Sequence, residues 1–82
     1  MNLLEQIIVE YYDAEIVKAD GFDDAVIGIE QNSMRLIYSV SKCLKILEQD
    51  MSKLQAIEYF TFNVSGADVG EKTPIWCWDN FE

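Results

Sequence analysis

The chain has 82 residues, of which 50% are hydrophobic and 26% are charged, and its formal net charge is −9. This length fits a single small domain (residues 1–82), and the apolar content argues against a disordered chain. The negative field would repel nucleic-acid phosphates and anionic lipid surfaces, so direct nucleic-acid or membrane binding is not expected. The sequence has no run of about 18 apolar residues, so no membrane-spanning helix is expected either.

The first element is predicted to be an amphipathic helix over residues 3–12. Apolar residues recur there at one-, three- and four-residue steps, which is the spacing of one helical face. These residues are Leu3, Leu4, Ile7, Ile8 and Tyr11. A break is expected at Ala19-Asp20-Gly21, because Gly21 can adopt a positive φ.

The next segments predict a β-hairpin. Two β-rich runs, residues 25–30 and 34–39, are separated by the polar tripeptide at 31–33. Alternation places Ala25, Ile27 and Ile29 on one face of the first strand. It likewise places Met34, Leu36 and Tyr38 on one face of the second strand. Gly28, on the opposite face, suggests a bulge or a close approach by another segment.

Two further helices and a last strand are expected. Helical spacing returns over residues 42–51, with Ser41 as the expected N-cap. Ser52 and Gln55 have the spacing of a capping box, and the helix that they begin should end near Asn63, before Gly66. Gly66 and Gly70 follow a helix and precede a strand, which is the reverse of a phosphate loop, and they predict a tight turn. After Pro74, residues 75–78 are typical of a strand.

The predicted order, α-β-β-α-α-β, indicates an α+β domain. We expect the last strand to join the hairpin and form a small three-stranded antiparallel or mixed sheet, packed on one face by about three helices. A two-stranded sheet alone would be marginally stable, so the fold should depend on the last strand.

Several short motifs occur in a recognisable order along the chain. They are Asp20-Gly-Phe-Asp-Asp-Ala-Val-Ile-Gly28, Leu36-Ile-Tyr38, Asp50-Met51, Ala56-Ile-Glu-Tyr-Phe60, Phe62-Asn63 through Gly66-Ala67, Val69-Gly-Glu71 and Thr73-Pro74. In these motifs, residues 20–76 resemble a family of small uncharacterised proteins from tailed bacteriophages. The family tends to have an aromatic residue at the position of Asp68. The resemblance implies a phage protein in the host bacterial cytoplasm, and it implies no established activity.

The sequence carries no recognisable reaction chemistry. It has no histidine, so the commonest general base and metal ligand is absent. An enzyme is therefore not expected, and no catalytic residue, cofactor or metal ligand is assigned. Asp20, Asp23 and Asp24 could offer oxygens to Mg²⁺ or Ca²⁺, but Gln31 stands where an EF-hand loop would have its last Glu. The favoured interpretation is that Asp23 or Asp24 caps a turn through backbone amides.

Cysteines and tryptophans leave alternatives open. Cys43 and Cys77 are interpreted as two buried thiols in a reducing compartment, although one disulfide between them is an alternative. Strand alternation places Trp76 and Trp78 on one face of the last strand. If that face is open, dimerisation or a partner would have to cover it. Alternatively, Trp76 lies inward with Phe60 and Phe62 while Trp78 covers an edge.

The favoured hypothesis is a small acidic phage accessory protein that acts by stoichiometric binding to a host or phage protein with a basic surface. It could inhibit a host protein or mimic a nucleic acid. The candidate partner-binding residues are Trp76, Trp78, Asp20, Asp23 and Asp24. The alternatives are a structural or homo-oligomeric phage protein, such as a homodimer, and a small cation-dependent enzyme that uses the acidic cluster.

Overall fold

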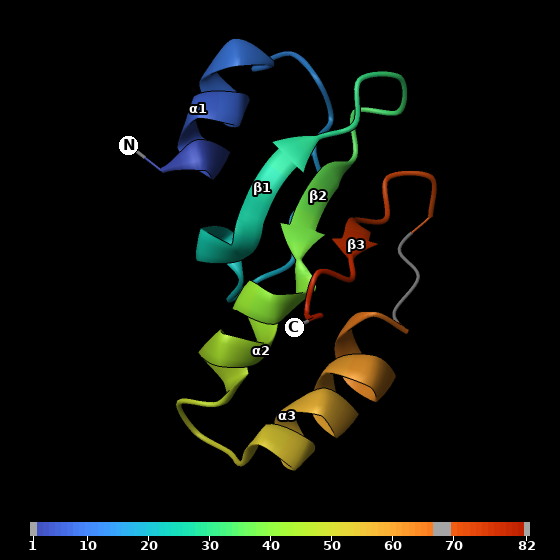
Figure 1. Ribbon diagram of the computed structural model, residues 1–82. Helices are drawn as coiled ribbons and strands as arrows, with labels where there is room; N and C mark the ends of the chain where they lie inside the picture. The colour runs from blue at the N-terminus through green and yellow to red at the C-terminus, as the bar shows by residue number, and fades with distance from the viewer. Residues whose placement is uncertain (1, 67–69, 82) are drawn as a thin grey trace.

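The protein has an α+β fold that combines helices with a three-stranded sheet (Figure 1). The computed structural model describes residues 2–66 and 70–81. In chain order, the described elements are α1 (Leu3–Glu10), η1 (Asp23–Ala25), β1 (Val26–Ile29), β2 (Leu36–Ser39), α2 (Val40–Leu47), α3 (Lys53–Tyr59), η2 (Phe60–Val64) and β3 (Ile75–Cys77). The predicted fold class and the order α-β-β-α-α-β are thus confirmed.

The sheet is mixed, with β2 at its centre. β1 pairs with β2 antiparallel, and β3 pairs with the other edge of β2 in parallel. A parallel neighbour needs a long crossover, which α2 and α3 supply here. In Figure 1, α1 lies beside β1, whereas α2 continues directly from β2 and α3 lies against α2. The expectation that the last strand completes the sheet is confirmed.

A β-bulge in β1 changes which side chains face the core. Val26 is opposite Tyr38 and Gly28 is opposite Ile37, so Ile27 is the extra residue. The bulge suggested by Gly28 is confirmed. The predicted alternation is wrong at Ile27, which is 38% exposed, whereas Val26 is only 4% exposed. One inserted residue reverses the side-chain alternation, and the strict alternation assumed for Ala25, Ile27 and Ile29 did not include that reversal.

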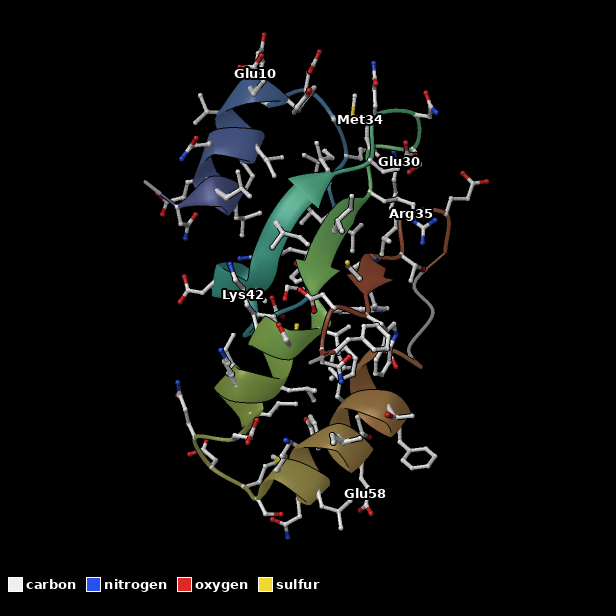
Figure 2. The ribbon with its side chains drawn as sticks, viewed as in Figure 1. Glu10, Glu30, Met34, Arg35, Lys42 and Glu58 are labelled. Carbon is white, nitrogen blue, oxygen red and sulfur yellow. The ribbon has the colours of Figure 1, made fainter. Side chains whose placement is uncertain are left out.

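The second strand begins later than the sequence pattern indicates. Leu36 and Tyr38 are fully buried, as expected, but Met34 has a φ of 58° and belongs to the turn. The Glu30 carboxylate shapes this turn by accepting hydrogen bonds from the backbone amides of Asn32 and Ser33, each 2.9 Å long. Figure 2 shows Glu30, Met34 and Arg35 together at this end of the hairpin.

The chain before β3 is fastened to the same turn. Lys72 Nζ donates a hydrogen bond of 2.8 Å to the backbone carbonyl of Ser33. Arg35 Nε donates to the backbone carbonyl of Thr73. Because both carbonyls are paired with cationic donors, these hydrogen bonds are of the stronger, charge-assisted kind. They place Pro74 and the start of β3 alongside β2.

Helix α2 begins two residues earlier than predicted. Its N-cap is Ser39, whose Oγ accepts a hydrogen bond from the Lys42 backbone amide at 3.2 Å, so the prediction of Ser41 was wrong. The reason is that β2 runs into α2 without a linker, and the last strand residue becomes the cap. Asp79, just after β3, accepts hydrogen bonds from Ser39 Oγ at 2.6 Å and from the Ser41 amide at 2.9 Å.

The capping box of α3 is confirmed. Ser52 Oγ accepts from the Gln55 amide at 3.2 Å, and Gln55 Oε1 accepts from the Ser52 amide at 3.0 Å. The helix continues into the π-helical η2 and ends at Val64, close to the predicted end near Asn63. The tight turn predicted between Gly66 and Gly70 falls on residues 67–69, which lie outside the described part of the chain.

The core is organised around Tyr38. Its side chain is fully buried, its ring centroid lies 5.1 Å from that of Trp76, and its hydroxyl oxygen accepts a 2.8 Å hydrogen bond from the Ala19 backbone amide. The segment before η1, which includes Ala19, passes behind the sheet (Figure 1). The other buried apolar residues are Leu4, Ile7, Phe22, Ala25, Val26, Leu36, Val40, Cys43, Leu44, Ala56 and Phe60.

Replacing Tyr38 tests this anchor. Tyr38→Phe keeps the ring but leaves the Ala19 amide without its acceptor, so we expect the free energy of unfolding to fall by about 1–3 kcal/mol. Urea denaturation measures this change. Tyr12→Phe is the matched control, because Tyr12 is 84% exposed and should change stability by less than about 0.5 kcal/mol. Equal effects of the two substitutions would contradict the anchor role.

Asp79 should make stability depend on pH. Its hydrogen bonds, above all that from Ser39, lower the pKa of Asp79 below its usual 3.8. A carboxylate whose pKa is lowered by folding stabilises the fold above its unfolded-state pKa, and the effect is lost as the pH falls through the folded-state pKa. We therefore expect Asp79→Ala to lower the urea midpoint at neutral pH, and its difference from the parent chain to shrink below about pH 4.

The same titration with Asn80→Ala, which changes the neighbouring position without removing a charge, is the control. If the difference in urea midpoint between Asp79→Ala and the parent chain stays constant down to about pH 2, the charge of Asp79 has no role in stability.

Candidate functional site

A pocket of about 440 Å³ lies between the segment of residues 17–22, the C-terminal end of α2, η2 and the start of β3. We call it the Trp76 pocket. Its apolar lining is provided by Val17, Ile46, Leu47, Met51, Val64 and Trp76, together with neighbouring atoms of residues 19–22 and Pro74. The volume falls within the roughly 300–1,000 Å³ typical of ligand-binding pockets.

The core fixes the walls of this pocket. Trp76 lies between the rings of Tyr38, 5.1 Å away, and Phe60, 5.3 Å away in an edge-to-face arrangement. The opposite wall is held by the hydrogen bond from the Ala19 amide to Tyr38. Both walls therefore depend on the same buried tyrosine. Trp76 Nε1 is buried, and none of the described residues supplies it with a hydrogen-bond acceptor.

Two of the three charged residues that line the pocket are acidic. Asp20 and Asp50 both line it and are exposed, and the other polar lining residues are Lys18, Tyr59 and Asn63. Lys18 Nζ lies 3.8 Å from a carboxylate oxygen of Asp23, which is outside the lining, so its charge is offset by a third acid. The pocket therefore combines an apolar floor with a negatively charged rim.

A shallower hollow on α3 continues from the pocket. We call it the α3 hollow. It adds Gln55, Glu58 and Phe62 to four residues that it shares with the Trp76 pocket. The shared residues are Asp50, Met51, Tyr59 and Asn63. Phe62 is 78% exposed, and Glu58 projects from α3 away from the sheet in Figure 2.

The structure brings two of the five predicted partner-binding residues to this pocket. Trp76 and Asp20 line it, whereas Trp78, Asp23 and Asp24 are not among its lining residues. Of the two interpretations of the tryptophans, the structure has Trp76 inward, packed against the core.

Trp78 covers an edge, as the inward interpretation requires. It is half-exposed and contacts Phe60 edge-on, with ring centroids 5.7 Å apart. The same interpretation was wrong about Phe62, which does not join the inward group. Phe62 lies in the π-helical η2, where the wider turn moves successive side chains away from α-helical positions.

The acidic cluster forms neither a cap nor a metal site. The N-cap of η1 is Phe22 and makes no side-chain cap hydrogen bond, so the prediction that Asp23 or Asp24 caps this turn was wrong. Asp23 is directed towards Lys18 instead, because a cation lies within reach. Over residues 2–66 and 70–81, no three acidic or thiol side chains are grouped closely enough to hold a metal ion.

Both cysteines are free thiols, so the alternative of a disulfide between them is wrong. Cys43 is fully buried in α2, as expected, but Cys77 is only half-buried. Burial, assisted by the negative charge of Asp79, raises the pKa of Cys43 to about 12. Cys43 therefore behaves as a small apolar core residue rather than as a nucleophile.

Sequence reasoning did not identify Asp50, Met51, Tyr59 and Asn63 as part of a site. Tyr59 and Asn63 are four residues apart, and this spacing would have shown that they share one side of a helix. No local signal could show that the segment of residues 17–22 lies opposite them, since that contact depends on the tertiary fold.

Comparison of the chain with protein-family models, with curated proteins and with solved structures finds no match. Within the described residues, none of the helices is long and apolar enough to cross a membrane.

The two thiols should differ in reactivity. A rise in the Cys43 pKa from 9.0 to about 12 lowers its thiolate fraction at neutral pH by about a thousandfold, and burial blocks access as well. We expect iodoacetamide to modify Cys77 in the native protein and Cys43 only after unfolding, as measured by mass spectrometry of Cys43→Ala and Cys77→Ala variants. Equal labelling rates in the native state would contradict the structure.

Proposed function

We propose that this chain is a small acidic phage accessory protein that works in the host bacterial cytoplasm by stoichiometric binding to a protein with a basic surface. Inhibition of a host protein is one form of this function, and mimicry of a nucleic acid is another. The phage origin rests on the resemblance of residues 20–76 to the phage family. The binding mode rests on the negative net charge of the chain and on the composition of its pocket.

The uncompensated negative charge is the observation that carries the proposal. The chain has 15 acidic residues against six basic ones. Among the described residues, only the Lys18–Asp23 pair comes within salt-bridge distance, at 3.8 Å. Most of the described carboxylates are exposed, so their negative charge reaches the solvent, where it accelerates association with positively charged surfaces and disfavours acidic ones.

The character of the pocket supports binding more than catalysis. It offers an apolar floor and two exposed carboxylates, together with Lys18, Tyr59 and Asn63. An active site would need a base held within hydrogen-bond distance of a nucleophile or a metal. An apolar anchor site with a charged rim is instead the usual composition of a protein-binding surface.

Self-association is the second candidate, and exposed aromatic side chains favour it. Tyr12, Phe62 and Phe81 are all largely exposed, and such residues are enriched at protein interfaces. The charge of −9 opposes it, because two copies repel each other. For this reason we place binding to a basic partner first.

Affinity capture at two salt concentrations tests the proposal. The tagged chain is immobilised and exposed to a lysate of the host bacterium at about 50 mM and about 500 mM salt, which changes the screening length more than twofold. We expect a basic protein to be retained in a ratio near 1:1 at low salt and to be released at high salt. Capture of no basic protein, or retention that salt does not affect, would refute the proposal.

Two further measurements separate the forms of this function. If the chain is a nucleic-acid mimic, double-stranded DNA should compete with it for the captured protein, and failure of DNA to compete would restrict the function to ordinary protein inhibition. Sedimentation of the purified chain at micromolar concentration should show a monomer. A stable dimer would favour the homo-oligomeric alternative.

A further inference from the structure

We propose that the Trp76 pocket and the α3 hollow together form the docking site for a peptide segment of the partner, in which a large apolar side chain is flanked by lysine or arginine. The inference rests on the function proposed above and deepens it by assigning the binding to one place. The apolar side chain would enter the pocket, and the flanking cations would face its acidic rim.

The shape of the site favours an extended occupant. The pocket and the hollow meet at four shared residues and together extend from the segment of residues 17–22 across the outer face of α3 and η2. A compact small molecule would fill the pocket alone. A peptide can fill the pocket with one side chain and lie along the hollow with the next ones.

The chemistry of the lining selects the anchor residue. The floor of the pocket combines the aliphatic side chains of Ile46, Leu47 and Val64 with the flexible Met51 and the ring of Trp76. Methionine and aromatic surfaces adapt to large apolar side chains, and buried aromatic anchors contribute most of the energy of many interfaces. A phenylalanine or leucine side chain therefore matches the floor.

The charge of the rim selects the flanking residues. Asp20 and Asp50 stand at the pocket and Glu58 at the hollow, and all three are exposed. The single base at the site, Lys18, is paired with Asp23. A peptide with cations on both sides of its anchor would meet carboxylates at both ends, whereas an acidic peptide would be repelled.

The site is preformed in the free protein, which lowers the cost of binding. Trp76 is held by ring contacts with Tyr38 and Phe60, and the opposite wall is tied down by the hydrogen bond from Ala19. Little of the pocket then has to be ordered when the peptide arrives. Because Trp76 is a fixed part of the pocket wall, the NMR signal of its indole N–H should report directly when a peptide occupies the pocket.

The test is an NMR titration with blocked pentapeptides. The ¹⁵N-labelled chain is titrated with Lys-Lys-Phe-Lys-Lys, Lys-Lys-Gly-Lys-Lys and Glu-Glu-Phe-Glu-Glu, each acetylated and amidated. We expect the first peptide to cause saturable shifts of the Trp76 indole N–H and of the Tyr59 and Asn63 amides. The glycine peptide should bind at least about tenfold more weakly, and the acidic peptide should cause no such shifts.

A pair of matched variants locates the interaction. Asp50→Lys and Glu10→Lys change the net charge equally, but only Asp50 lines the site. We expect Asp50→Lys to weaken binding of the Lys-Lys-Phe-Lys-Lys peptide at least about tenfold and Glu10→Lys to change it less than about twofold. Both residues are exposed, and the spectrum of each variant reports directly whether the fold is retained.

Three outcomes would overturn the inference. They are the absence of shifts at the pocket, equal weakening by the two variants, and binding of free phenethylamine as tight as that of the peptide, which would assign the pocket to a small organic cation. If a basic protein is still captured from the lysate by the Asp50→Lys variant, the proposed function stands and only this site is refuted.

Discussion

The structure depends on the burial of one polar side chain, Tyr38, at the centre of the sheet. Tyr38 belongs to the middle strand, and its ring is fully buried in the core. Its hydroxyl oxygen accepts a hydrogen bond from the backbone amide of Ala19, which lies in a segment without helix or strand. A phenol with the usual pKa of 10 is already neutral at physiological pH, and burial raises the pKa of Tyr38 further, so ionisation does not compete with this hydrogen bond. A buried hydroxyl is tolerated only when it is paired, and the pairing in turn holds the segment in place.

The two edges of β2 explain how such a short sheet is stabilised. On one edge, β1 is antiparallel and its bulge at Ile27 turns Val26 and Ile29 towards the core. On the other edge, the three-residue β3 is fastened before its start by Arg35 and Lys72 and after its end by Asp79. These side-chain hydrogen bonds thus add stability that the backbone pairing of three residues alone could not provide, since isolated short strands are marginally stable.

Much of this fold could be predicted from the sequence, because the signals were local. The capping box at Ser52, the break near Gly66 and the strand after Pro74 each follow from the chemistry of one or a few adjacent residues. The prediction failed where a residue's role was decided by distant parts of the chain. Ser39 rather than Ser41 caps α2 because the strand runs straight into the helix, and Asp79 then binds both serines from forty residues away.

The candidate site, like the fold, could be predicted only where the signal was local. Trp76 and Asp20 were singled out for an aromatic strand and an acidic cluster, and the structure brings both to one pocket. Asp50 was placed in the helical run of residues 42–51 and Asn63 at the end of the next helix, and neither was assigned to a site, although both stand at the junction of the pocket and the hollow. Their role depends on the position of the segment of residues 17–22 opposite α2 and η2, and Tyr38 fixes that position through a contact between residues 19 positions apart.

Amide hydrogen exchange at Ala19 measures whether Tyr38 anchors the segment before η1. Ala19 lies in a segment without regular secondary structure, so its amide would exchange rapidly unless Tyr38 holds it. We expect this amide to exchange as slowly as the hydrogen-bonded amides of β2, through global unfolding alone. Exchange at the rate of an exposed loop amide would show that the segment is not anchored, and the pocket that it walls would lose its physical basis.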